Sequence, residues 1–186
     1  MAHHRVCPWW MGYLLLSPIR KWRQDPTRIL APYVRADMTV LEPGPGMGFF
    51  TLEIARLVGP SGRVIAVDVQ PHMIEALRRR ARKTGLADRI DARTVSPSSM
   101  ELSGLDAAVD FVFAFAVVHE MPSAATFFAE ATRAMKPGAK LLLAEPSGHI
   151  RQEEFESEIA LAARNGLSVA ERPATFGGLG AVLKKS

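Results

Sequence analysis

Short apolar runs alternate with longer amphipathic segments along most of the chain. Runs separated in this way by glycine and proline predict strands that alternate with helices, the pattern of a mostly parallel sheet covered by helices on both faces. The run 109–115 is apolar almost throughout, as expected for a central strand. Strands are expected at 38–42, 63–68, 90–95, 109–115 and 139–145, and helices at 48–58, 71–84, 123–135 and 151–165.

Two further apolar runs, 167–172 and 179–184, follow the last expected helix and are connected by a glycine-rich segment. Such a pair predicts a final hairpin. A chain of 186 residues with 48% hydrophobic content can bury one substantial core. We therefore expect a single α/β domain at 28–186, preceded by an N-terminal segment at 1–27.

The stretch VLEPGPGMGFFT at 40–51 is the most informative part of the chain. It reads as a buried strand, an acid (Glu42), a turn with glycines at alternate positions, and the start of a helix. Glycine has no Cβ and accepts positive φ, so a ligand can approach the bare backbone of such a turn. Asp68 ends the next apolar strand about 20 residues later, where α/β nucleotide-binding folds hold ribose hydroxyls. The two features together predict a cofactor that carries a nucleoside.

The spacing of the glycines separates two classes of cofactor. Dinucleotide folds use G-x-G-x-x-G, whereas this chain has E-x-G-x-G-x-G with Phe49 at the position of the third dinucleotide glycine. Glu42 would repel a pyrophosphate but suits an ammonium group. The turn resembles motif I of the class I S-adenosylmethionine-dependent methyltransferases, and Asp68 in VIAVDVQ resembles their motif II.

The resemblance continues through VDFVFAFAVVHEMP at 109–122 and MKPGAKLLLAEP at 135–146, and covers about residues 28–186. The HEMP and MKPGAK segments are similar to the ubiquinone/menaquinone-type C-methyltransferases. The family implies a Rossmann-like, doubly wound α/β fold. Its seven-stranded sheet is mostly parallel, with a final antiparallel strand between two neighbours. The family also implies S-adenosylmethionine as the cofactor.

By this resemblance, Glu42 attracts the ammonium of the cofactor, amides of the glycine turn face its carboxylate, and Asp68 binds the ribose. Without a ligand, Glu42 is a partner for a helix dipole and Asp68 an ordinary acid at a strand end. Many family members also carry an acid after the third strand, where this chain has TVSPSSMEL; Ser98 is the expected substitute, or part of a plain loop. The expected cofactor-binding residues are Glu42, Gly44, Pro45, Gly46, Gly48, Asp68, Val69, Ser98, Ala114 and Phe115.

Three polar residues are candidates for the acceptor side. His119 and Glu120 follow the fourth strand, and Glu145 ends the fifth, at the edge where open α/β sheets place ligands. Histidine titrates near neutrality, so His119 is expected either to accept a proton from the acceptor or to position its loop. Glu145 is expected to act as a base or a substrate clamp. No metal site is expected, and the single cysteine, Cys7, excludes a cysteine-rich zinc site.

Composition and the N-terminus bound the partners and the location. A net charge of +4 gives weak attraction to anions but does not imply nucleic-acid binding. One cysteine fits a reducing, cytoplasmic compartment. All three tryptophans lie in the N-terminal segment, which we interpret as packing on the sheet edge, a lid over the substrate, or a peripheral contact with a membrane. Export is not expected, because Pro8 and Gly12 interrupt the apolar run and no small-residue cleavage site follows.

The leading hypothesis is methyl transfer to a small-molecule acceptor. An alternative from another class is a module that binds S-adenosylmethionine or S-adenosylhomocysteine without catalysis, which the same cofactor residues would also suit. Methylation of RNA or tRNA is a further alternative. Amino-methylases of bases carry Asp/Asn/Ser-Pro-Pro-aromatic after the fourth strand, where this chain has AFAV. The oligomeric state is left open.

Overall fold

The computed structural model describes residues 24–146, 148–173 and 178–186. Seven strands form one sheet in the order β3-β2-β1-β4-β5-β7-β6. The pairs β1–β2, β2–β3 and β4–β5 are parallel, and β7 runs antiparallel to both β5 and β6. This is the expected fold class, and the final hairpin is confirmed. Predictions for the tryptophan-rich stretch and Cys7 lie outside the described residues.

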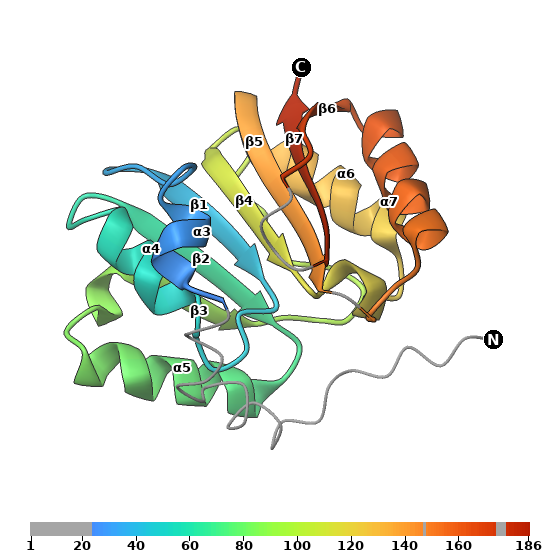
Figure 1. Cartoon of the computed structure of the whole chain (residues 1–186). Coiled ribbons are helices and arrows are strands. Elements are labelled where there is room, and N and C mark those ends of the chain that lie inside the picture. Colours follow the sequence, from blue (N-terminus) through green and yellow to red (C-terminus); the bar gives the residue numbers. More distant parts are fainter. Residues whose placement is uncertain (1–23, 147, 174–177) are drawn as a thin grey trace. The chain divides into compact units, whose positions relative to one another are not determined.

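The chain divides into two compact units, one before and one from residue 96, and each is described by itself (Figure 1). In the first, β1 and β2 are buried along almost their whole length, as expected for strands covered on both faces. Leu41, Ile54, Ile65, Ile74 and Leu77 are among its fully buried side chains. The elements are α3 (Pro26–Leu30), β1 (Thr39–Pro43), α4 (Thr51–Leu57), β2 (Arg63–Asp68), α5 (Pro71–Lys83), η1 (Ala87–Arg89) and β3 (Ile90–Thr94).

Two helices of the first unit differ from expectation. The helix expected to begin at residue 48 begins at Thr51, because Gly46 and Gly48 have φ of 53° and 84°, outside the helical region. Helix α3 was not predicted, although its start carries a recognisable signal. Asp25 accepts a hydrogen bond from the Thr27 amide at 3.0 Å, and proline follows it at the first helical position.

In the second unit, α6 and α7 lie side by side next to the strands (Figure 1). Phe111, Phe113, Phe128 and Phe155 are fully buried and form much of its apolar interior. The elements are β4 (Val109–Phe115), η2 (Val118–Glu120), α6 (Ala124–Ala134), β5 (Met135–Pro146), α7 (Gln152–Arg164), β6 (Leu167–Glu171) and β7 (Gly178–Lys185).

Strand β5 starts earlier than expected. Met135 already pairs with Val109, and the register then shifts so that Lys140 lies opposite Phe111. Gly138, with φ of 76°, lies within this irregularity. The Lys-Pro-Gly signal that predicted a helix stop therefore marks a bulge inside a strand as well. Among the described residues, no helix has the length and apolar character needed to cross a membrane.

Candidate functional site

The glycine turn after β1 is held by its own backbone. The Gly44 amide donates to the Val67 carbonyl at 2.9 Å, and the Gly48 amide donates to the Pro45 carbonyl at 3.0 Å. A Cβ at Gly48 would collide with the Leu77 side chain, whereas a Cβ at Gly46 would meet no atom within 4 Å. Glycine at position 48 is favoured by its φ of 84° and by the close approach of α5. Gly46 instead borders open space, as expected where a ligand approaches bare backbone.

Asp68, the last residue of β2, is fixed against this turn. One carboxylate oxygen accepts the Gly46 amide at 3.3 Å, and the other accepts the Gln70 amide at 2.9 Å. The residue is 8% exposed, and burial raises its pKa, although the backbone donors oppose that shift. Each oxygen has a second lone pair, so the carboxylate can also accept hydrogen bonds from two hydroxyl groups.

Glu42 is a buried acid without full compensation. It is 3% exposed, and its Oε2 has no hydrogen-bond partner among the described residues. Burial raises its pKa to about 8; repulsion from Asp68 adds to the shift, and interaction with the Thr51 hydroxyl opposes it. A cation placed beside Glu42 would stabilise the ionised form. The residue therefore fits the ammonium end of the expected cofactor.

These three features fit S-adenosylmethionine. Glu42 suits its ammonium, the open backbone at Gly46 suits its amino-acid carboxylate, and Asp68 suits its ribose hydroxyls. The glycines, Pro45 and Val69 lie in the same unit as these residues, with Pro45 buried and Val69 half-buried.

The other expected cofactor residues belong to the second unit. Ala114 and Phe115 end β4 and are buried. Ser98 is exposed, with its hydroxyl 2.9 Å from that of Ser96. The neighbouring Ser99 hydroxyl donates to Glu130 of α6 at 2.7 Å, which ties this loop to the helix. Cofactor contacts of Ser98, Ala114 and Phe115 stay predictions.

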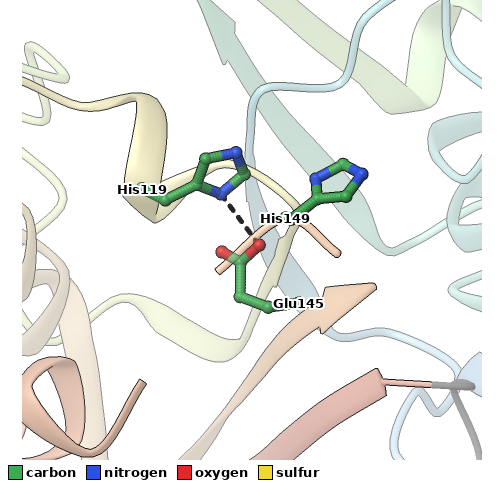
Figure 2. A group of neighbouring side chains, drawn as sticks. All are labelled: His119, Glu145 and His149. Atoms are coloured by element: carbon green, nitrogen blue, oxygen red, sulfur yellow. Dashed lines mark ion pairs between the residues drawn. The ribbon is translucent and has the colours of Figure 1, made fainter. Parts of the chain in front are cut away.

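A second group of polar side chains lies where β4 and β5 end. His119, in η2, and Glu145, near the end of β5, bring Nδ1 and Oε2 to 2.8 Å (Figure 2). The Glu145 side chain is fully buried, whereas that of His119 is 20% exposed. The ring of His149 stands edge-on to that of His119, with centroids 5.3 Å apart. The structure thus brings two predicted residues together and adds a third.

The contact between His119 and Glu145 is close but poorly aimed. Neither Glu145 oxygen has a hydrogen-bond partner among the described residues when angles are considered, so the contact is electrostatic in character. Contact with Glu145 is the main cause that raises the pKa of His119; burial opposes the rise, and the charges of Glu120 and Glu158 add to it. Glu120 Oε1 is 4.0 Å from His119 Nε2, beyond hydrogen-bond distance.

The backbone around this cluster explains its position. Ala116, just after β4, has φ of 54°, which is costly for a residue with a Cβ. Its amide donates to the Ala144 carbonyl at 2.8 Å, so the turn that carries His119 is attached beside Glu145. On the other side of β5, Gly178 of β7 lies so close that a Cβ there would collide with the Glu145 carbonyl.

Two residues of this cluster were not predicted. His149 follows Glu145 by four positions, and a histidine just beyond a strand-end acid is a weak signal that could have been noticed. Glu158 is 7% exposed and lies on the face of α7 that buries Phe155, Ile159 and Ala162. Burial and repulsion from Glu145 raise its pKa to about 7, while His119 opposes the rise. Glu158 could have been noticed in the sequence, because it is an acid at a position of the helix where an apolar residue is expected.

Comparison with known proteins shows the family of the chain. Residues 35–173 match the family described as "Methyltransferase domain". The ubiquinone/menaquinone biosynthesis C-methyltransferase UbiE of Brucella anthropi is 31% identical over 126 residues, which is 68% of this chain and 47% of that protein. The chain spans about a quarter to about half of the length of such curated relatives, from 27% to 54%.

Solved structures share the fold. A SAM-dependent methyltransferase from Aquifex aeolicus superimposes with a TM-score of 0.84 and 25% identity, covering 96% of this chain and 98% of that one. The cyclase SpnF shares the fold alone, with a TM-score of 0.68 and 22% identity over 80% of this chain and 59% of that one. By its family match and its fold, the chain belongs to the S-adenosylmethionine-dependent methyltransferase domain family.

Proposed function

We propose that this protein transfers the methyl group of S-adenosylmethionine to a small-molecule acceptor. When bound, the cofactor supplies a methyl group attached to a sulfonium sulfur. After transfer of the methyl group, the rest of the cofactor is the leaving group, a neutral thioether. The chain's own residues then have two tasks, to hold the cofactor and to hold the acceptor in line with it. Positioning of this kind can account for roughly 7–11 kcal/mol of a reaction barrier.

One observation carries the proposal: Glu42 and Asp68 flank a turn whose central glycine borders open space. Asp68 is held by the Gly46 and Gln70 amides, so its carboxylate is oriented before any ligand arrives. Glu42 keeps a buried oxygen without a hydrogen-bond partner among the described residues. An oriented acid for hydroxyls and a buried acid for an ammonium match two ends of S-adenosylmethionine, and neither suits a pyrophosphate.

The acceptor side is assigned to His119, Glu120 and Glu145. His119 is partly exposed with the buried Glu145 2.8 Å behind it, an arrangement in which a carboxylate stabilises the charge of a histidine that takes a proton from the acceptor. A small-molecule acceptor is supported by similarity to proteins such as the ubiquinone/menaquinone C-methyltransferase UbiE.

A second candidate is cofactor binding without methyl transfer. The buried oxygen of Glu42, unpartnered among the described residues, and the oriented carboxylate of Asp68 would serve such a module, since both would hold the cofactor and neither would touch an acceptor. The cofactor residues of the first unit fit both candidates equally. The polar cluster around His119 favours catalysis, since a pure binding module has no need of a buried acid behind a partly exposed histidine.

The test is transfer of isotopically labelled methyl from S-adenosylmethionine to pools of quinones, phenols, amines and thiols. Formation of S-adenosylhomocysteine with label in an acceptor supports the enzyme. Tight binding of the cofactor with no transfer to any pool supports the binding module instead. A matched control is His72→Ala, which removes an exposed histidine of α5 and should leave transfer unchanged.

A further inference from the structure

The cluster at the end of β5 has the composition of a metal site as well as of a proton-transfer pair. His119, Glu145 and His149 each offer one ligand atom, and these atoms all lie within 4.8 Å of one another (Figure 2). We propose that these three residues bind one first-row divalent transition-metal ion, with Zn²⁺ as the first candidate. No metal site was expected from the sequence, because the single cysteine excludes a cysteine-rich zinc site and no other ligand set was predicted.

The distances are compatible with metal binding after a small adjustment. Ligands at 2.0–2.2 Å from a tetrahedral zinc ion lie about 3.3–3.6 Å from one another. His119 Nδ1 and Glu145 Oε2, at 2.8 Å, are already closer than this. His149 must supply most of the adjustment. Its side chain is exposed, so a rotation toward the other two meets little resistance.

Glu145 shows the strongest sign of an unfilled coordination site. It is 1% exposed, and its Oε1 has no hydrogen-bond partner in the part of the chain that the structure describes. A buried carboxylate oxygen without a donor is costly, and a metal ion would remove that cost. The close but poorly directed approach of His119 Nδ1 has a simple reading under this proposal. Both atoms then point their lone pairs toward a shared cation rather than sharing a proton.

The surrounding charge also favours a cation. Glu120 Oε1 lies 4.0 Å from the other ring nitrogen of His119, so its negative charge acts on this site without a hydrogen bond. Glu158 is buried nearby, close enough for its charge to act on both Glu145 and His119. Two further acids around a site with one carboxylate ligand can offset the charge of a dication.

The ligand set selects the type of metal. Two imidazoles and one carboxylate suit Zn²⁺, Co²⁺, Ni²⁺ or Fe²⁺, whereas Mg²⁺ and Ca²⁺ prefer oxygen ligands throughout. Three protein ligands also leave at least one position for water or another oxygen. The next step rests on the proposed function: an acceptor oxygen would bind at the open position of the metal, and the metal would lower the pKa of that oxygen. His119 would then be a metal ligand rather than a base, and the acceptor oxygen would lose its proton to water.

The experiment titrates the metal-free protein of 186 residues with Zn²⁺ by calorimetry and with Co²⁺ by visible absorption. We expect one equivalent to bind in each case. His149→Ala should weaken binding by at least about tenfold, since even outer-shell substitutions cost 10–100-fold. Glu145→Gln should do the same, while His72→Ala should bind as the unchanged protein does. Circular dichroism of each variant checks that the fold is retained.

Metal binding by the N-terminal histidines and cysteine must be distinguished from binding at His119, Glu145 and His149. A protein with His3→Ala, His4→Ala and Cys7→Ser removes the histidines and thiol near the N-terminus and should bind as before. The proposal is overturned if neither metal binds, if His149→Ala and Glu145→Gln bind like the unchanged protein, or if binding is lost only with the N-terminal substitutions.

Titration of the same samples with S-adenosylhomocysteine keeps the two proposals apart. A protein that binds this ligand but no metal overturns the metal site and leaves methyl transfer intact. A protein that binds the metal but not S-adenosylhomocysteine overturns the proposed function and leaves the metal site.

Discussion

The two groups of polar residues in this protein are built in different ways. The acids of the first unit belong to contiguous strand–turn segments, and backbone amides orient Asp68. The cluster of the second unit draws on η2, β5, the loop after β5 and α7, and side chains hold one another there. A site of the first kind depends on local backbone conformation. A site of the second kind depends on strand register and packing.

The buried acids Glu42 and Glu145 also differ in what surrounds their carboxylates. Among the described residues, no cationic side chain offsets the burial of Glu42, and its pKa rises to about 8. Glu145 is equally buried but has His119 at 2.8 Å. Glu42 is prepared for a ligand that brings a positive charge, whereas the nearby imidazole of His119 already offsets part of the burial of Glu145. The following predictions test whether cofactor affinity depends on the first group and not on the second.

The largest effect is expected from Gly46→Val. Valine is strained at φ of 53°, and its side chain would occupy the open space beside the turn. We expect affinity for S-adenosylhomocysteine to fall by more than about 100-fold, equivalent to about 2.7 kcal/mol, in calorimetric titration. Gly85→Val is the matched control, because Gly85 also has positive φ and open space but follows α5. Retained affinity in Gly46→Val would show that the cofactor does not approach this turn.

Asp68→Ala should weaken cofactor binding by about 1.5–3 kcal/mol, because a charged hydrogen-bond acceptor for the ribose is lost. Its control is Asp91→Ala, which removes an acid of β3 that pairs with Arg63 and Arg93. Calorimetry with S-adenosylhomocysteine measures both. Equal affinities for the two variants would remove Asp68 from the site.

Glu42→Gln should raise the free energy of unfolding of the cofactor-free protein, and this gain should increase with pH. The folded-state pKa of about 8 lies above the ordinary value of 4.5, so between these values only the unfolded chain releases the proton. Protonation of Glu42 therefore makes the free energy of unfolding of the natural protein decrease between about pH 4.5 and pH 8. Glutamine has no such proton, so the variant lacks this decrease. We expect a gain of about 1–3 kcal/mol at pH 8 in chemical unfolding, and little at pH 4.5.

Glu75→Gln, on the exposed face of α5, is the control for this change and should show no such dependence on pH. A Glu42→Gln protein whose advantage is the same at both pH values would mean that Glu42 is already ionised in the fold. The same variant should bind the cofactor more weakly, since it cannot pair with an ammonium.

The smallest effect on cofactor affinity is expected from His119→Ala and Glu145→Gln. Both should stay within about twofold of the natural protein, the range of substitutions outside a binding site. Methyl transfer, once an acceptor is found, should fall by about 10²–10⁴-fold in His119→Ala because a proton acceptor or metal ligand is removed. A tenfold loss of cofactor affinity in either variant would place the cluster in the cofactor site.

Much of the fold could be predicted because apolar runs and glycines act locally. The strand Val109–Phe115 and the helix from Pro71 match their patterns closely. The early start of β5 could not be predicted, since its pairing with Val109 depends on a bulge around Gly138. The same contrast holds for the sites. Glu42 and Asp68 are marked by their neighbours in the chain, whereas His149 and Glu158 acquire their surroundings only through packing.

The most direct test is calorimetric titration of the purified protein with S-adenosylmethionine, S-adenosylhomocysteine and NAD in parallel. The buried Glu42, the open turn at Gly46 and the oriented Asp68 predict micromolar binding of the first two and none of NAD. Binding of NAD alone would contradict the assignment of this turn to a cofactor that carries an ammonium.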